Sequence, residues 1–134
     1  MGQRISIITL VVRDYDEAIA YYTQVLGFVV LKDQAVSPGK RWVVVRPKGT
    51  EGTALLLAKA ATSTQASRVG DQTGGRVFLF LYTNDFSTDY RTLLRKGVVF
   101  EEEPRQEPYG TVAVFRDLYG NRWDLIEPGT SGSR

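Results

Sequence analysis

The sequence predicts an α+β chain made of two tandem βαβββ modules whose curved mixed sheets enclose a cavity. Three observations support this prediction. The same order of apolar and helical segments occurs twice along the chain, and each helical segment begins at an aspartate, Asp14 or Asp85. A third observation is that turn and strand residues recur at an offset of seventy: Gly27 and Gly97, Pro38 and Pro108, Arg46 and Arg116. A chance match would not keep the whole order of elements.

The first module is expected over residues 4–58. An apolar strand ends at Asp14, which is a plausible helix N-cap, and Glu17 stands three residues later as in a capping box. Apolar residues then recur at helical spacing until Gly27, a typical helix stop. Three β-prone segments follow, at residues 28–31, 42–46 and 54–57.

The second module, residues 76–128, repeats this pattern. Asp85 is the expected cap, an apolar stripe runs through the next segment, and Gly97 is the expected stop. The β-prone segments are residues 98–100, 112–116 and 123–126. Residues 59–75 are rich in small and polar residues and are interpreted as the linker, with one possible helical turn at 65–68.

Composition excludes several classes of site. The 134 residues include no cysteine and no histidine, so thiolate zinc sites, cysteine nucleophiles and imidazole bases are all excluded. The net charge is +2 and basic residues alternate with acidic ones, which argues against a nucleic-acid surface. The sequence has no apolar run long enough to cross a membrane and no signal-peptide pattern, so we expect a cytoplasmic protein.

Two segments carry a family resemblance. Residues 9–22, with Leu26-Gly27-Phe28, and residues 115–125 (Phe-Arg-Asp-Leu-Tyr-Gly-Asn-Arg-Trp-Asp-Leu) resemble the opening and closing motifs of the vicinal-oxygen-chelate superfamily, which includes glyoxalases, bleomycin resistance proteins and extradiol dioxygenases. The resemblance covers residues 4–128 and implies the glyoxalase-like fold. Function does not follow from that fold.

The resemblance also indicates where relatives place metal ligands. Three of these positions fall on the apolar residues Ile7, Phe78 and Leu56, the last with a register uncertain by one or two residues; the fourth falls on Asp124. One carboxylate does not hold a catalytic divalent ion. We therefore expect no metal site and no cofactor. Asp124 itself either faces the cavity or pairs with Arg122 or Arg116.

The expected ligand pocket combines these positions with neighbouring ones. Phe80 shares a strand face with Phe78 by alternation. The resemblance places Trp42 and Tyr109 near the cavity mouth. The full expected lining is Ile7, Thr9, Trp42, Leu56, Phe78, Phe80, Tyr109 and Asp124.

Two functions remain open at this point. The first is a metal-independent protein that binds a small molecule in a largely apolar cavity, as in the bleomycin-resistance branch. The alternative is a lyase or isomerase of the same superfamily, with an atypical metal site or with Asp124 as general base. A homodimer is expected because one module cannot cover both faces of its own sheet. Whether modules pair within a chain or between two chains is left open, as is the identity of the ligand.

Overall fold

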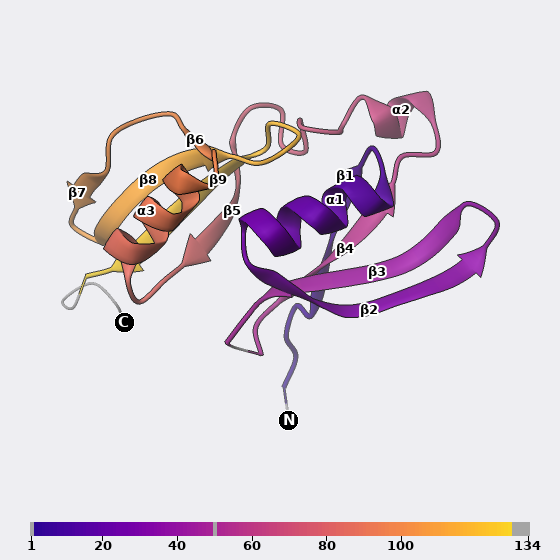
Figure 1. Cartoon of the computed structure of the whole chain (residues 1–134), viewed down its shortest axis with the longest axis horizontal. Helices are drawn as coiled ribbons and strands as arrows, with labels where there is room; N and C mark the ends of the chain where they lie inside the picture. Colours follow the sequence, from indigo (N-terminus) through magenta and orange to yellow (C-terminus); the bar gives the residue numbers. More distant parts are fainter. Residues whose placement is uncertain (1, 50, 130–134) are drawn as a thin grey trace. The chain divides into compact units, whose positions relative to one another are not determined.

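The computed structural model describes residues 2–49 and 51–129 (Figure 1). By their internal contacts the residues form two compact units, residues 1–69 (unit 1) and residues 70–134 (unit 2). Unit 1 contains a four-stranded sheet and unit 2 a five-stranded sheet, each accompanied by helix. The predicted α+β class is therefore confirmed. The boundary between the units falls inside the segment 59–75 that we interpreted as a linker.

Unit 1 follows the predicted order of elements and ends in a short helix. Its elements are β1 (Ile7–Val12), α1 (Tyr15–Ala20), the π-helical segment η1 (Tyr21–Val25), β2 (Phe28–Ser37), β3 (Lys40–Pro47), β4 (Ala54–Lys59) and α2 (Ser63–Ala66). The strand order is β1-β4-β3-β2. β1 and β4 are parallel, whereas the other neighbours are antiparallel.

The start and end of the first helical segment follow from local chemistry. The carboxylate of Asp14 accepts the backbone N–H of Glu17 at 2.8 Å, as the capping pattern predicts. Gly27 has a φ of 79°, a left-handed conformation that favours glycine, and the chain then enters β2.

The helix of unit 1 packs on one face of the sheet. Ala18 and Tyr22 are fully buried, as are Leu10 of β1 and Leu57 of β4, which are register partners. Because side chains alternate along a strand, the residues between them point to the opposite face. The face beneath α1 therefore supplies the buried core of unit 1.

Unit 2 repeats this plan with one added strand. Its elements are β5 (Val77–Tyr82), α3 (Phe86–Arg95), β6 (Val99–Phe100), β7 (Arg105–Glu107), β8 (Gly110–Arg116) and β9 (Arg122–Pro128). The order is β5-β9-β8-β6, and β7 also pairs with β8. The carboxylate of Asp85 caps α3 by accepting the N–H of Thr88 at 3.2 Å.

An aromatic row connects α3 to the sheet of unit 2. The ring centroids of successive pairs lie 4.7–5.7 Å apart, in the range of favourable aromatic contacts. The row consists of Phe86, Tyr90, Phe100, Phe115 and Trp123. Trp123 is accordingly a core residue, as the sequence suggests.

The turn between β8 and β9 is organised by the buried carboxylate of Asp117. Its Oδ1 accepts the backbone N–H groups of Tyr119, Gly120 and Asn121 at 2.9–3.1 Å. Its Oδ2 accepts from the Asn121 side chain at 3.0 Å and from the Trp123 indole at 3.1 Å. The motif Asp117-Leu118-Tyr119-Gly120-Asn121 thus has a structural role, because one acid satisfies five donors.

The structure differs from the sequence expectations in three places. β2 continues to Ser37 instead of ending near residue 31, since its pairing with β3 extends to the tip of the hairpin. β7 (Arg105–Glu107) is a strand that the sequence analysis did not predict, and it ends just before a turn that contains Pro108. The helical turn of the linker is Ser63–Ala66, and begins two residues before the expected Gln65, because Thr62 caps it.

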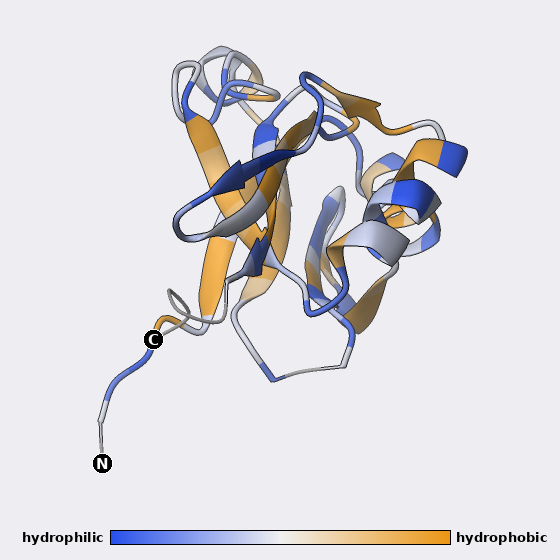
Figure 2. Ribbon diagram, turned by 90° about the vertical axis from the view of Figure 1, so that its left-hand side faces the viewer, coloured by the Kyte–Doolittle hydropathy of each residue, from blue (hydrophilic) through white to orange (hydrophobic). Residues whose placement is uncertain are grey.

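In both units the apolar residues are concentrated in the strands and the hydrophilic residues in the turns (Figure 2). Long stretches of strand are coloured hydrophobic, the helices carry both colours, and hydrophilic residues gather in turns (Figure 2). Within the described part of the chain, no helix is both long enough and apolar enough to cross a membrane.

Candidate functional site

Four of the expected pocket residues lie on the same face of the unit 1 sheet, opposite α1. Thr9 of β1 is the register partner of Leu56 of β4, and Leu56 is in turn paired with Val44 of β3. Paired residues on adjacent strands project to the same side. Ile7 and Trp42 lie two residues from Thr9 and Val44, so they project there as well. This face of the sheet is called the open face of unit 1 below.

A pocket of about 690 Å³ lies at one end of this sheet. The tip of the β2–β3 hairpin forms one wall, from Ser37 to Trp42, and the end of β4 with the two residues after it forms another. Tyr15 of α1 and Gln65 of α2 complete the lining. We call this hollow the unit 1 pocket; it brings together Trp42 and Leu56 of the expected set.

The walls of the unit 1 pocket are held by hydrogen bonds and ion pairs. The Tyr15 hydroxyl oxygen accepts the backbone N–H of Arg41 at 3.1 Å, and the Arg41 guanidinium lies 5.2 Å from the centroid of the Tyr15 ring. That guanidinium also donates to Asp16 at 2.9 Å and to Asp33 at 2.7 Å. Hydrogen bonding from Arg41 lowers the pKa of the Asp33 carboxyl, so this pairing persists at neutral pH.

On the far wall, Gln65 fixes the segment that follows β4. Its side-chain oxygen accepts the backbone N–H of Ala61 at 2.7 Å, and α2 is capped by the hydroxyl of Thr62. The sequence did not indicate that the linker would reach the hairpin tip. The contributions of Tyr15, Lys40, Arg41, Lys59 and Gln65 to the pocket were therefore missed.

In unit 2, Asp124 occupies the centre of the sheet. It is paired with Phe80 on β5 and with Val114 on β8, so all three project to one face. Asp124 is only 7% exposed, and its Oδ1 has no hydrogen-bond partner among the described residues. Burial raises the pKa of the Asp124 carboxyl, an effect only partly offset by the charges of Arg105 and Arg122.

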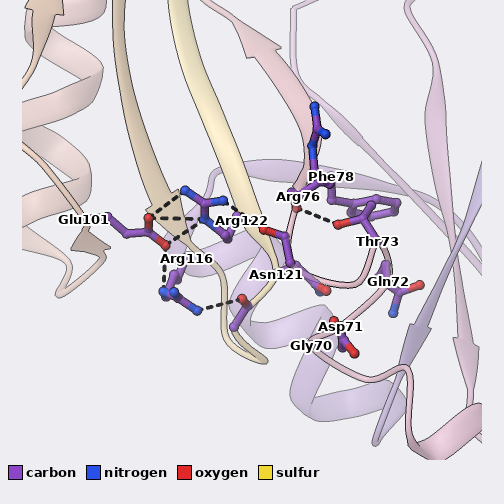
Figure 3. Close-up of a pocket in the computed structure, with 12 residues that line it drawn as sticks. Gly70, Asp71, Gln72, Thr73, Arg76, Phe78, Glu101, Arg116, Asn121 and Arg122 are labelled. Atoms are coloured by element: carbon purple, nitrogen blue, oxygen red, sulfur yellow. Dashed lines mark hydrogen bonds and ion pairs between the residues drawn. The ribbon is translucent and has the colours of Figure 1, made fainter.

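The arginines that we considered as partners for Asp124 bind another acid. Arg122 and Arg116 donate to Glu101 at 2.9 Å and 2.8 Å respectively (Figure 3). Hydrogen bonding from Arg122 is the main cause of the lowered pKa of the Glu101 carboxyl. Of the two interpretations of Asp124, the structure favours a buried carboxylate on a sheet face over an ion-paired surface residue.

Phe78 lies at an irregularity in the pairing of β5 with β9, between Val77 and Leu79. It lines a second pocket, of about 440 Å³, together with the glycine-rich segment 70–75 and the Glu101–Arg122 ion pair (Figure 3). Arg122 also donates to the carbonyl oxygen of Gly75 at 2.9 Å. Of the three arginines that line this unit 2 pocket, Arg116 and Arg122 are paired with Glu101, and Arg122 also anchors the glycine-rich segment through the Gly75 carbonyl.

Tyr109 lies in the turn between β7 and β8 and lines neither pocket. The structure thus groups Trp42 and Leu56 in the unit 1 pocket, Ile7 and Thr9 on the same open face, and Phe80 with Asp124 on a face of unit 2. Phe78 and Tyr109 stand separately.

The donor set does not fit a metal ion of the kind the superfamily employs. The cross-strand neighbours of Asp124 are Phe80 and Val114, and neither offers a donor atom. Across residues 2–49 and 51–129 there is no group of three or more acidic side chains placed to hold a metal ion. The residues present are better suited to apolar contact than to coordination.

The raised pKa of the Asp124 carboxyl leads to a prediction about the stability of the fold. A carboxyl whose pKa is raised in the folded state destabilises the fold as pH rises above its ordinary value of 3.8, because the unfolded chain loses that proton first. We expect Asp124→Asn to raise the free energy of unfolding at neutral pH by about 1 kcal/mol, and to give little gain near pH 3. Urea unfolding across this pH range measures it.

The matched control is Glu103→Gln, at an exposed acid of the same unit. This variant should change the free energy of unfolding little at any pH. A stabilisation by Asp124→Asn that is largest in acid and vanishes at neutral pH would contradict the assignment.

Comparison with known proteins places the chain in a family. Residues 4–125 match the Glyoxalase/Bleomycin resistance protein/Dioxygenase superfamily. An uncharacterized protein of Shewanella frigidimarina (strain NCIMB 400) is 51% identical over 128 residues, which are 95% of each chain. The crystal structure of UcmS2 is 33% identical with a TM-score of 0.81, and covers 95% of this chain and 99% of its own.

A second solved structure is similar over nearly the whole chain. TnmS3, an antibiotic binding protein from Streptomyces sp. CB03234, is 30% identical with a TM-score of 0.77, and the match covers 96% of this chain and 98% of TnmS3. These matches agree with the two sheets and with the motifs at both ends of the sequence. The chain belongs to the Glyoxalase/Bleomycin resistance protein/Dioxygenase superfamily.

Proposed function

We propose that this protein binds a small, largely apolar organic molecule and holds it without a metal ion. The observation that carries the proposal is the unit 1 pocket, a hollow of about 690 Å³ with an aliphatic floor and a tryptophan on its wall. Its volume is that of a site for a drug-sized molecule. Trp42 is 41% exposed, which leaves its ring available to a ligand.

The relatives support a binding role. TnmS3 is an antibiotic binding protein, and its identity of 30% extends over almost the whole chain. Of the four positions where the resemblance places metal ligands, three are the apolar residues Ile7, Leu56 and Phe78, and Leu56 lines the unit 1 pocket. An antibiotic is therefore the class of molecule to test first.

The proposal can be tested with the neutral fluorescent probe N-phenyl-1-naphthylamine. We expect the full chain to bind the probe saturably, and Trp42→Ala to weaken binding about tenfold, because an aromatic contact of this kind contributes about 1 kcal/mol beyond its buried area. Fluorescence titration gives the dissociation constants. The control Leu94→Ala removes an apolar side chain of α3 with similar exposure and should bind as the unsubstituted protein does.

Absence of saturable binding by the unsubstituted protein would remove the basis of the proposal. Equal weakening by Trp42→Ala and Leu94→Ala would instead show that the probe binds elsewhere. Circular dichroism melting curves of both variants confirm that each remains folded.

We also propose that a second copy of the chain covers part of the sheet surface. On β5 of unit 2, Phe80 is 59% exposed and Tyr82 67%, and the two side chains project to the same face of the strand. Large apolar side chains gathered on one strand face are typical of an association surface. A second copy is the proposed partner because each chain carries two sheets of the same kind, and a face of one sheet can pack against that of another copy.

Sedimentation equilibrium tests this association. We expect twice the chain mass of 15.0 kDa at micromolar concentration, and a shift toward the single chain in Tyr82→Asp, since a charge at this position opposes burial. Leu94→Asp, on the surface of α3, should leave the mass unchanged. A single-chain mass at every concentration would refute the dimer.

A catalytic role for Asp124 is the second candidate function. The specific observation is a buried carboxyl with a raised pKa and an oxygen that has no partner among the described residues. Such a group suits a general base in a lyase or isomerase. An Asp124→Asn variant that still binds a substrate but does not convert it would support this role, and full activity in that variant would exclude it.

A further inference from the structure

The polar groups of the unit 1 pocket are strongly biased toward hydrogen-bond donors. No aspartate or glutamate lines the pocket, whereas Lys40, Arg41 and Lys59 all do. The other polar side chains of the lining are those of Tyr15, Ser37, Trp42 and Gln65, and each has at least one N–H or O–H group. A ligand in this pocket therefore meets donors and positive charge, and must itself supply acceptors.

The bonds already made within the protein sharpen this bias. The Tyr15 oxygen accepts from Arg41, which leaves the hydroxyl hydrogen to be donated. The Gln65 oxygen accepts from Ala61, so the end of this side chain that is not used in that bond is its amide N–H₂. In both side chains the oxygen already accepts a backbone N–H of the protein, whereas the O–H or N–H₂ group can donate to a ligand.

The charges of the pocket are only partly balanced. The Arg41 guanidinium is paired with Asp16 and Asp33, neither of which lines the pocket. Lys40 and Lys59 form no ion pair with any described residue. Lys40 lies two residues from Trp42 and projects to the open face with it, whereas Lys59 is the register partner of buried Val12 and projects from the end of β4 to the other face. An anion beside Trp42 would therefore complement Lys40 first.

The remaining surface of the pocket sets the rest of the ligand's chemistry. Leu56, Ala58 and Ala60 form an aliphatic floor, and Trp42 presents its ring at 41% exposure. A flat apolar body can lie against the indole and the floor while its polar end reaches Lys40.

We propose that the ligand of the unit 1 pocket is an aromatic acid, with a carboxylate or an ionised phenol held by Lys40 and a ring system held against Trp42, in a lining that contains no acid. This inference rests on the proposed binding function and narrows it to one charge class. It also distinguishes the pocket from the unit 2 pocket, whose lining includes the acids Asp71 and Glu101, with Glu101 paired to Arg116 and Arg122.

Three probes with one ring system test the charge class on the full chain. They are 2-naphthoate, which is anionic, 2-naphthalenemethanol, which is neutral, and 2-naphthylmethylammonium, which is cationic. The chain has two tryptophans, so a ¹⁵N-labelled sample gives two indole N–H resonances. Trp123 donates its indole N–H to buried Asp117 at 3.1 Å and serves as the internal reference.

We expect 2-naphthoate to bind three- to tenfold more tightly than the neutral alcohol, because charge-assisted contacts at a partly exposed site contribute roughly this much. The ammonium compound should bind most weakly. The Trp42 indole resonance should shift on titration and that of Trp123 should stay. The variant Lys40→Gln should lose the preference for naphthoate and retain affinity for the alcohol.

Lys48→Gln is the control, because Lys48 lies outside the pocket and carries the same charge. It should leave the preference unchanged. Equal binding of naphthoate and alcohol, a preference for the ammonium, or the same loss in Lys48→Gln would each overturn the anionic assignment while the binding function stands. If no probe binds, including the neutral N-phenyl-1-naphthylamine, both proposals fail.

Discussion

The packing of a helix on only one face of each sheet is the constraint on which the rest of this structure depends. In unit 1 the alternation of side chains along the strands gives Leu10 and Leu57 to the core beneath α1, and leaves Thr9 and Leu56 on the other face. That second face has no helix of its own unit to cover it. This face is where a ligand or a second chain can bind, and both proposals on function start from it.

The two units share the order of their elements but differ in how their charged side chains are paired. In unit 2 the arginines near the end of the sheet are bound to Glu101, and the glycine-rich segment is tied to them through the Gly75 carbonyl. In unit 1 the lysines beside the pocket have no such acid. The two pockets therefore differ in their charges: acids line the unit 2 pocket, whereas no acid lines the unit 1 pocket.

The sequence predicted the elements better than the site. Caps at Asp14 and Asp85 and stops at Gly27 and Gly97 are local signals, and they were read correctly because each acts within one helical turn. The pocket depends on the approach of the hairpin tip to residues 58–65, which no local pattern encodes. Phe78 illustrates the same limit, since period-two alternation cannot reveal an irregularity in strand pairing.

The central claim is that this member of the superfamily binds an organic molecule through the side chains of the unit 1 pocket and without a metal ion. The most direct measurement combines metal analysis with titration of N-phenyl-1-naphthylamine, before and after exhaustive dialysis against a chelator. The account predicts far less than one metal ion per chain and the same dissociation constant in both samples. Stoichiometric metal, or binding that is lost with the chelator and restored by a divalent ion, would contradict it.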